Sequence, residues 1–272
     1  MSELSRRVLS AIVFVPIVAG LVYTGGWALF GLVVLVVGRG AWELLILAEA
    51  AGYRPARHVG VALAVALCVY LQRFGADRWF PLAQMTAVLV ALLATLRHGV
   101  NRYSANALLT LGGMMYVGLL GSAPLLLARQ VGDDASWLMI AIFTCIWLTD
   151  TFAYGGGRLW GQRRLALSIS PGKTVVGFVC GLVGALVPLL LISRLPSWSV
   201  LELGGLLLVV GIGGQLGDLV ESAIKRDLGV KDAPSLIPGH GGMLDRFASY
   251  FFAFPLADIY SVSLRGESNQ LM

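Results

Sequence analysis

The chain has 272 residues, of which 57% are hydrophobic and only 13% are charged, and its net charge is +5. Soluble domains are nearer half apolar and about a quarter charged, so this composition excludes an ordinary soluble protein and indicates a polytopic membrane protein. No polar block is long enough to fold as a soluble domain. The modest positive charge is typical of basic loops on the inner side of a membrane rather than of a nucleic-acid-binding surface.

Nine apolar segments are candidates to cross the bilayer, since a spanning helix needs about 20 mostly apolar residues. They are, roughly, residues 8–24, 27–48, 59–72, 80–96, 107–127, 137–153, 174–193, 200–217 and 247–264, and the third is the weakest because it is short. The sequence therefore predicts an all-α membrane protein with about nine transmembrane helices. We expect the helices of residues 1–136 to form a scaffold with a lipid groove, and those of residues 137–272 to carry the functional motifs.

The basic residues of the loops predict how the helices are oriented. If the N-terminus is cytoplasmic, 14 Lys and Arg residues lie on the cytoplasmic side and 5 on the other side. Because cytoplasmic loops carry an excess of basic residues, this bias favours a cytoplasmic N-terminus and an external C-terminus. The same orientation places both long polar loops, 154–173 and 218–246, on the cytoplasmic side.

Charged residues are concentrated between Gln215 and Ser249, next to apolar segments on both sides. Asp218, Glu221 and Lys225 are spaced to share one face of a helix, and Asp245 follows a loop rich in Pro and Gly. Carboxylates at both ends of such a loop suit one or two divalent cations, with phosphate oxygens as further ligands. The alternative is a solvated helix end with an ordinary Glu221–Lys225 pair, and spacing alone does not decide between the two.

Two other features have a functional and a plain structural interpretation. Gly241 and Gly242 follow His240 in a turn whose backbone N–H groups can converge on an anion, and His240 is either a phosphate contact or an ordinary surface histidine. Asp150 ends a strongly apolar run, so its carboxylate either has a partner or a cation, or marks a helix end at the membrane surface.

The segment Ser170–Thr174 is similar to a phosphate-binding P-loop but lacks its first glycine, since Leu167 stands at that position. What remains is Lys173 and Thr174 at the expected start of a helix, beside Arg163 and Arg164. Such an arrangement suits phosphate binding, and non-specific attraction to anionic lipid is the alternative.

Several segments together closely resemble the signature of the CTP:phosphatidate cytidylyltransferases, integral membrane enzymes that make CDP-diacylglycerol. The signature segments are Gly217-Asp218-Leu219-x-Glu221-Ser222-x-x-Lys225-Arg226, Gly229-Val230-Lys231-Asp232 and Pro238-Gly239-His240-Gly241-Gly242-x-x-Asp245-Arg246. Asp150–Arg158 and Ser168–Thr174 resemble two further family segments. In the N-terminal half, only the general hydropathy and the step Ala41-Trp42-Glu43 are similar.

The resemblance implies a metal-dependent nucleotidyltransferase of phospholipid synthesis that transfers CMP from CTP to phosphatidate and releases pyrophosphate. It implies Mg²⁺ as the cofactor, with K⁺ as a possible monovalent partner, and it suggests a homodimer. The expected location is the inner membrane of a bacterium, with the active site facing the cytoplasm and no nucleic-acid partner.

The same resemblance assigns roles to individual residues. The metal ligands it implies are Asp218, Asp245, Asp150 and Glu221. The implied catalytic residues are Asp218, Asp245, Lys225, Arg246 and His240. The implied contacts to the nucleotide phosphates are Lys173, Thr174, Arg226, Lys231, Gly241 and Gly242.

Three positions depart from the family pattern. Ala248 replaces a second Asp, Pro234 replaces a small residue, and Val176 stands where the family usually has Glu. Two missing carboxylates near a cation site support one alternative, a catalytically impaired homologue that acts as a lipid-binding partner. Another alternative is a cytidylyltransferase for a different membrane lipid phosphate, such as a polyprenyl phosphate. A transporter is disfavoured because the charges gather on one face rather than near the midplane.

Overall fold

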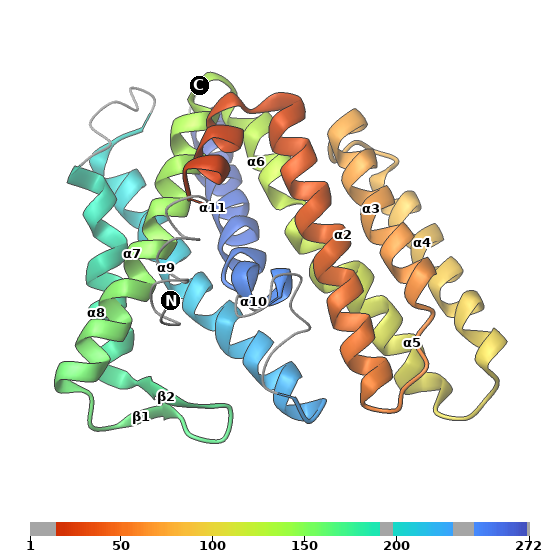
Figure 1. Ribbon diagram of the computed structural model, residues 1–272. Helices are drawn as coiled ribbons and strands as arrows, with labels where there is room; N and C mark the ends of the chain where they lie inside the picture. The colour runs from red at the N-terminus through yellow and green to blue at the C-terminus, as the bar shows by residue number, and fades with distance from the viewer. Residues whose placement is uncertain (1–14, 191–197, 231–241, 271–272) are drawn as a thin grey trace. The chain divides into compact units, whose positions relative to one another are not determined.

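The computed structural model describes residues 15–190, 198–230 and 242–270 (Figure 1). The chain divides into two compact units. Unit 1 comprises Met1–Leu126 and Asp227–Phe247, and unit 2 comprises Leu127–Arg226 and Ala248–Met272. Each unit therefore combines two separate stretches of the chain. The functional division expected at residue 136 stays a prediction.

The regular elements of unit 1 in its described residues are all helices. It begins with the helical segment Val15–Thr24 and continues with α2 (Gly26–Ala50), α3 (Arg57–Phe74), α4 (Phe80–Thr95), η1 (Leu96–His98), α5 (Tyr103–Gly112), the π-helical η2 (Gly113–Leu119) and α10 (Met243–Phe247). Helix α2 packs against α3, η2 and α10, while α4 packs against α5. The connection between α2 and α3 is held by α5, because Arg54 N–H donates to Asn106 Oδ1 at 2.8 Å and Ala56 N–H donates to Thr110 Oγ1 at 2.9 Å.

Unit 2 contains long helices and one small sheet. Its elements are α6 (Ala123–Val131, which starts in unit 1), η3 (Gly132–Asp134), α7 (Ala135–Trp160), β1 (Arg164–Ala166), β2 (Ser170–Thr174), α8 (Val175–Leu186), η4 (Val187–Leu190), α9 (Val200–Asp227) and α11 (Tyr250–Gln270). The two strands pair antiparallel, with Arg164 opposite Thr174 and Ala166 opposite Ser170. Aromatic rings join α7 to α11, since Phe143 lies 4.7 Å from Tyr250 and 5.5 Å from Phe254 between ring centroids.

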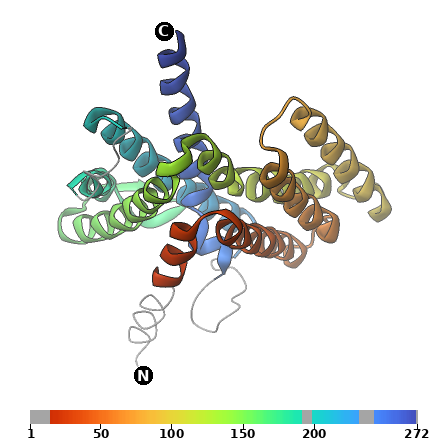
Figure 2. The same cartoon turned by 90° about the horizontal axis from the view of Figure 1, so that it is seen from above.

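Helices α7 and α8 form the closest packing in unit 2 and lie side by side in both views (Figures 1 and 2). Small residues make this approach possible. A Cβ added to Gly156 would lie 2.4 Å from Cys180 Sγ, and one added to Gly184 would lie 2.6 Å from Leu148 O. The glycines of α7 and α8 therefore let two apolar helices approach each other closely, as is common in membranes.

The prediction of an all-α polytopic membrane protein is confirmed in its main feature, but the count of nine spans is not. Within the described residues, six helices are long and apolar enough to cross a membrane: Gly26–Ala50, Phe80–His98, Tyr103–Val131, Ala135–Trp160, Val200–Asp227 and Met243–Leu264. The segments Val15–Thr24 and Val175–Leu190 are apolar but shorter, and α3 is not among the six. The hairpin β1–β2 is a small exception to the helical architecture.

Two predicted helix boundaries were wrong. The loop expected at 154–173 is helical up to Trp160, because the glycines beside Tyr154 lie in α7 where α8 packs closely. Asp150 therefore lies ten residues before the end of α7 rather than at a helix end. Likewise α9 continues through Asp227, so the loop expected at 218–246 begins later, whereas the helix expected to carry Asp218, Glu221 and Lys225 is confirmed.

Candidate active site

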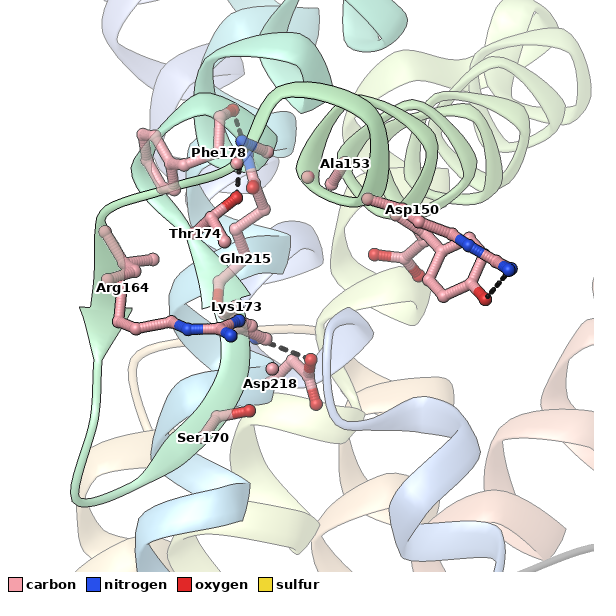
Figure 3. Close-up of a pocket in the computed structure, with 16 residues that line it drawn as sticks. Asp150, Ala153, Arg164, Ser170, Lys173, Thr174, Phe178, Gln215 and Asp218 are labelled. Atoms are coloured by element: carbon pink, nitrogen blue, oxygen red, sulfur yellow. Dashed lines mark hydrogen bonds and ion pairs between the residues drawn. The ribbon is translucent and has the colours of Figure 1, made fainter.

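A cavity of about 680 Å³ opens in unit 2 where the C-terminal part of α7, the hairpin, the start of α8 and α9 meet (Figure 3). Its charged lining consists of two carboxylates and three basic groups, which are Asp150, Asp218, Arg158, Arg164 and Lys173. Residues from four elements thus contribute to one polar space. The sequence predicted Asp150, Lys173, Thr174 and Asp218 for the site, and the structure brings all four to this cavity.

Lys173 and Asp218 form the central contact of the cavity. Lys173 Nζ lies 2.6 Å from Asp218 Oδ2 and 3.5 Å from the backbone oxygen of Gln215 (Figure 3). The two side chains are 26% and 39% exposed, so both remain accessible to a ligand. The pair therefore joins β2 to α9 and holds a cation and a carboxylate side by side at the cavity wall.

Gln215 fixes the position of α9 against α8. Its Nε2 donates to Phe178 O at 3.2 Å, and a Cβ added to Gly181 would lie only 3.0 Å from the Gln215 amide. Asp218 follows three residues later on the same helix. Because the Gln215 amide connects the two helices one turn before Asp218, it sets the register in which Asp218 meets Lys173.

Thr174 ends the hairpin and begins α8. Its buried side chain accepts a hydrogen bond from Gly177 N–H at 3.0 Å, which is the usual arrangement of a helix N-cap. The prediction that Lys173 and Thr174 stand at the start of a helix is confirmed. The preceding strand is part of an antiparallel hairpin, which differs from the context of a P-loop.

The basic side of the cavity is formed by α7 and the hairpin. Arg158 Nη1 donates to Tyr154 Oη at 3.2 Å, and Arg164 extends from β1 (Figure 3). Together with Lys173 these groups can neutralise several phosphate oxygens. Asp150 is exposed, and with Asp218 it offers carboxylate oxygens for a cation. The arrangement suits a polyphosphate bound together with a divalent cation.

Glu221 and Lys225 are placed differently from the other predicted site residues. Glu221 Oε1 lies 2.8 Å from Lys225 Nζ, and the two side chains are 2% and 11% exposed. The structure thus shows the i,i+4 pair that was the plainer interpretation, although it is buried rather than solvated. Neither residue lines the cavity. Arg226 Nε donates to Ile169 O at 3.3 Å and so connects the end of α9 to the hairpin.

Asp245, Arg246 and Gly242 belong to unit 1. Asp245 Oδ2 accepts a hydrogen bond from Gly242 N–H at 3.1 Å, and Arg246 is exposed on α10. The predicted residues Lys231, His240 and Gly241 lie outside the described residues. That Asp245 shares a cation with Asp218 stays a prediction.

The carboxylates of the cavity fit a magnesium ion only if other ligands complete its shell. Across residues 15–190, 198–230 and 242–270, no three His, Cys, Asp or Glu side chains gather closely enough to hold a metal. Mg²⁺ is commonly bound by one or two carboxylates, with water and substrate phosphates in the remaining positions. Asp150 and Asp218 match that pattern, since they line a space that also presents phosphate-binding bases.

Two residues with clear roles were not identified from the sequence. Gln215 was noted only as the start of the charged segment, and Glu43 only as the last residue of the step Ala41-Trp42-Glu43, which is similar to the family. Glu43 is fully buried in α2, pairs with Arg39 and accepts a hydrogen bond from Leu244 N–H. The signal that could have found it is a lone acid within an apolar run, with an arginine four residues earlier.

The comparisons with known proteins cover nearly the whole chain. A family model described as the cytidylyltransferase family matches residues 5–264. A protein of Staphylococcus aureus (strain COL) named phosphatidate cytidylyltransferase is 33% identical over 261 residues, which are 93% of this chain and 95% of that protein. A protein of the same name from Staphylococcus haemolyticus is 37% identical over 214 residues, 75% of this chain and 80% of its own length. A third protein of this name, from Synechocystis sp., is 33% identical over 298 residues, which cover 98% of this chain and 99% of that protein.

Proposed function

This chain belongs to the cytidylyltransferase family, and we propose that it transfers CMP from CTP to phosphatidate, giving CDP-diacylglycerol and pyrophosphate. The observation that carries the proposal is the cavity in which Lys173 pairs with Asp218 at 2.6 Å beside Asp150 and two arginines. The names of the relatives suggest the substrates. The matched segments of these relatives extend over both units of the chain. The two alternatives, a catalytically impaired homologue and a cytidylyltransferase for another lipid phosphate, are therefore not favoured.

The chemistry needs charge stabilisation more than it needs a base. The second pKa of a phosphate monoester is about 6, so the phosphate of phosphatidate is already ionised at neutral pH. This phosphate attacks the α-phosphorus of CTP, and pyrophosphate leaves. Because two polyanions must approach each other, the protein has to supply positive charge in fixed positions.

The cavity supplies that charge. Lys173, Arg158 and Arg164 contact the phosphate oxygens of CTP and of the departing pyrophosphate, and Asp218 orients the Lys173 ammonium through their pair. Asp150 and Asp218 would hold Mg²⁺, which when bound supplies further positive charge to the phosphates. Gln215 keeps α8 and α9 in the register that this arrangement requires.

The remaining assignments follow from the family resemblance. We propose Asp245 as a further metal ligand, and we propose phosphate-binding or turn-shaping roles for Lys225, Arg226, Arg246, Lys231, His240, Gly241 and Gly242. Glu221 is the weakest of the proposed metal ligands, because its carboxylate is buried against Lys225. A K⁺ ion and a homodimer are further proposals.

We also propose that the protein resides in the inner membrane of a bacterium, with its N-terminus and active site on the cytoplasmic side. The relatives are bacterial, and six apolar helices support the membrane location. The excess of basic residues in the predicted cytoplasmic loops supports the orientation.

The test is incorporation of radiolabelled CTP into chloroform-soluble lipid by purified protein in mixed micelles with Mg²⁺. Separate reactions contain phosphatidate or a polyprenyl phosphate, and parallel reactions contain EDTA or the variant Asp218→Asn. We expect incorporation with phosphatidate only, and its loss with EDTA and in Asp218→Asn. If folded protein labels neither lipid, the proposed cytidylyltransferase activity is refuted. If it labels the polyprenyl phosphate alone, phosphatidate is refuted as the substrate.

A further inference from the structure

Glu43 is a buried carboxylate in the apolar helix α2, and both of its oxygens have a donor. Its side chain is 0% exposed, and Oε1 accepts a hydrogen bond from Arg39 Nε at 2.9 Å, one turn earlier on the helix. A buried carboxylate is costly unless it is paired and hydrogen-bonded. A protein that only needed an apolar helix would place a hydrophobic side chain at this position.

The second oxygen of Glu43 makes a contact far along the chain. Oε2 accepts a hydrogen bond from the backbone N–H of Leu244 at 2.8 Å, although the two residues are 201 positions apart. Helix α10 packs against α2 within unit 1, and Leu244 is itself buried. Glu43 therefore connects the arginine of its own helix to the first turn of α10.

The residues next to Leu244 are the predicted site residues Asp245 and Arg246. Asp245 Oδ2 accepts from Gly242 N–H at 3.1 Å, and Arg246 N–H donates to Gly242 O at 3.3 Å. These two bonds are local to the turn. The Glu43–Leu244 bond instead joins the turn to α2, the 25-residue helix against which α10 packs.

We propose that Glu43 is a positioning residue, which holds Leu244 so that Asp245 and Arg246 stand in fixed positions for the transfer reaction. The role in the reaction rests on the proposed function of Asp245, whereas the hold on α10 does not. Arg39 assists by occupying the other carboxylate oxygen, which leaves Oε2 directed at Leu244.

The variant Glu43→Gln tests this proposal with little change in volume. Arg39 and Leu244 donate to different oxygens of Glu43, and a glutamine has an oxygen at only one of these two positions and an NH2 donor at the other, so one of the two hydrogen bonds is lost. The matched control is Glu49→Gln on the same helix, because the carboxylate of Glu49 pairs with Arg57 on α3, whereas that of Glu43 accepts from Leu244 on α10. Glu43→Asp keeps the charge on a shorter side chain and serves as a milder second variant if Glu43→Gln folds poorly.

Two readouts are measured on detergent-purified protein whose thermal unfolding is recorded first. The first is hydrogen–deuterium exchange of peptides covering Leu244–Phe247. We expect exchange about tenfold faster in Glu43→Gln than in wild type, as loss of a hydrogen bond to a charged acceptor implies, and unchanged exchange in Glu49→Gln. The second readout is kcat, together with the Mg²⁺ concentration for half-maximal activity.

We expect Glu43→Gln to lower kcat at least tenfold and to raise the Mg²⁺ requirement, with Glu49→Gln close to wild type. Unchanged exchange of the Leu244–Phe247 peptides in Glu43→Gln and Glu43→Asp would overturn the hold on α10. Faster exchange with normal kcat and normal Mg²⁺ requirement would overturn the positioning role. A wild-type protein without transfer activity would contradict the proposed function instead, and the exchange measurement would still decide whether Glu43 holds α10.

Discussion

Replacing Lys173 by glutamine should abolish most of the transfer activity while leaving the fold nearly unchanged. Lys173 Nζ lies 2.6 Å from Asp218 Oδ2, and the side chains are 26% and 39% exposed. An ion pair that is this accessible contributes only about 0–1 kcal/mol to stability, because solvent screens it. A group that stabilises charge in the transition state is worth about 10²–10³ in kcat when it is removed. Lys173→Gln should therefore lose most of its activity and almost none of its stability.

The assay compares initial rates of CDP-diacylglycerol formation with thermal unfolding in the same detergent. Lys173→Gln should lose about 10²-fold or more in kcat while its Tm stays close to that of wild type. Lys173→Arg retains the positive charge and should recover part of the rate. Arg164→Gln should also slow the reaction, whereas the neighbouring Arg163→Gln should not, because Arg163 is exposed and does not line the cavity.

The reasoning would be refuted if Lys173→Gln kept its rate within about twofold of wild type, since a transition-state contact is worth far more than that. It would also fail if Arg163→Gln and Arg164→Gln slowed the reaction equally, because general surface charge would then explain the effect.

Two further predictions concern packing in unit 2, and both are checked by thermal or denaturant unfolding. Gly156→Ala should destabilise the protein by about 1–3 kcal/mol, because its Cβ would lie 2.4 Å from Cys180 Sγ. Gly155→Ala on the same helix has nothing within 4 Å and should stabilise by about 0.5–1 kcal/mol, so equal effects of the two changes would contradict the packing described. Lys225→Met should destabilise by about 3 kcal/mol, because it leaves Glu221 buried without its lysine. The double change with Glu221→Gln should recover much of that loss, and simple addition of the two single effects would show that the pair is not coupled.

The parts of the molecule that follow from local pattern were predictable, and the parts that depend on distant contacts were not. Apolar runs of sufficient length identified the six long helices, and a lysine and threonine before an apolar run identified the start of α8. The length of α7 was missed because Asp150 and three glycines resemble a helix end, whereas close packing against α8 keeps the helix intact. The hairpin was missed because β1 has only three residues, too few for an alternating pattern.

In the candidate site, too, the residues with recognisable chemistry were predictable, and those that act through distant partners were not. Asp218 and Lys173 were chosen for their chemistry, and their 2.6 Å contact brings two distant segments of unit 2 together. The roles of Gln215 and Glu43 depend on acceptor and donor atoms 37 and 201 positions away. No local spacing identifies such partners, because a buried amide or carboxylate only indicates that a partner exists.

The most direct test of the account is the fate of the individual phosphates of CTP. Purified protein is incubated with phosphatidate, Mg²⁺ and CTP labelled with ³²P at either the α or the γ position, and label in chloroform-soluble lipid is compared with released pyrophosphate. Attack at the α-phosphorus predicts that only the α label enters lipid and that one pyrophosphate appears for each lipid labelled. Entry of the γ label into lipid would show phosphoryl rather than cytidylyl transfer and would contradict the account.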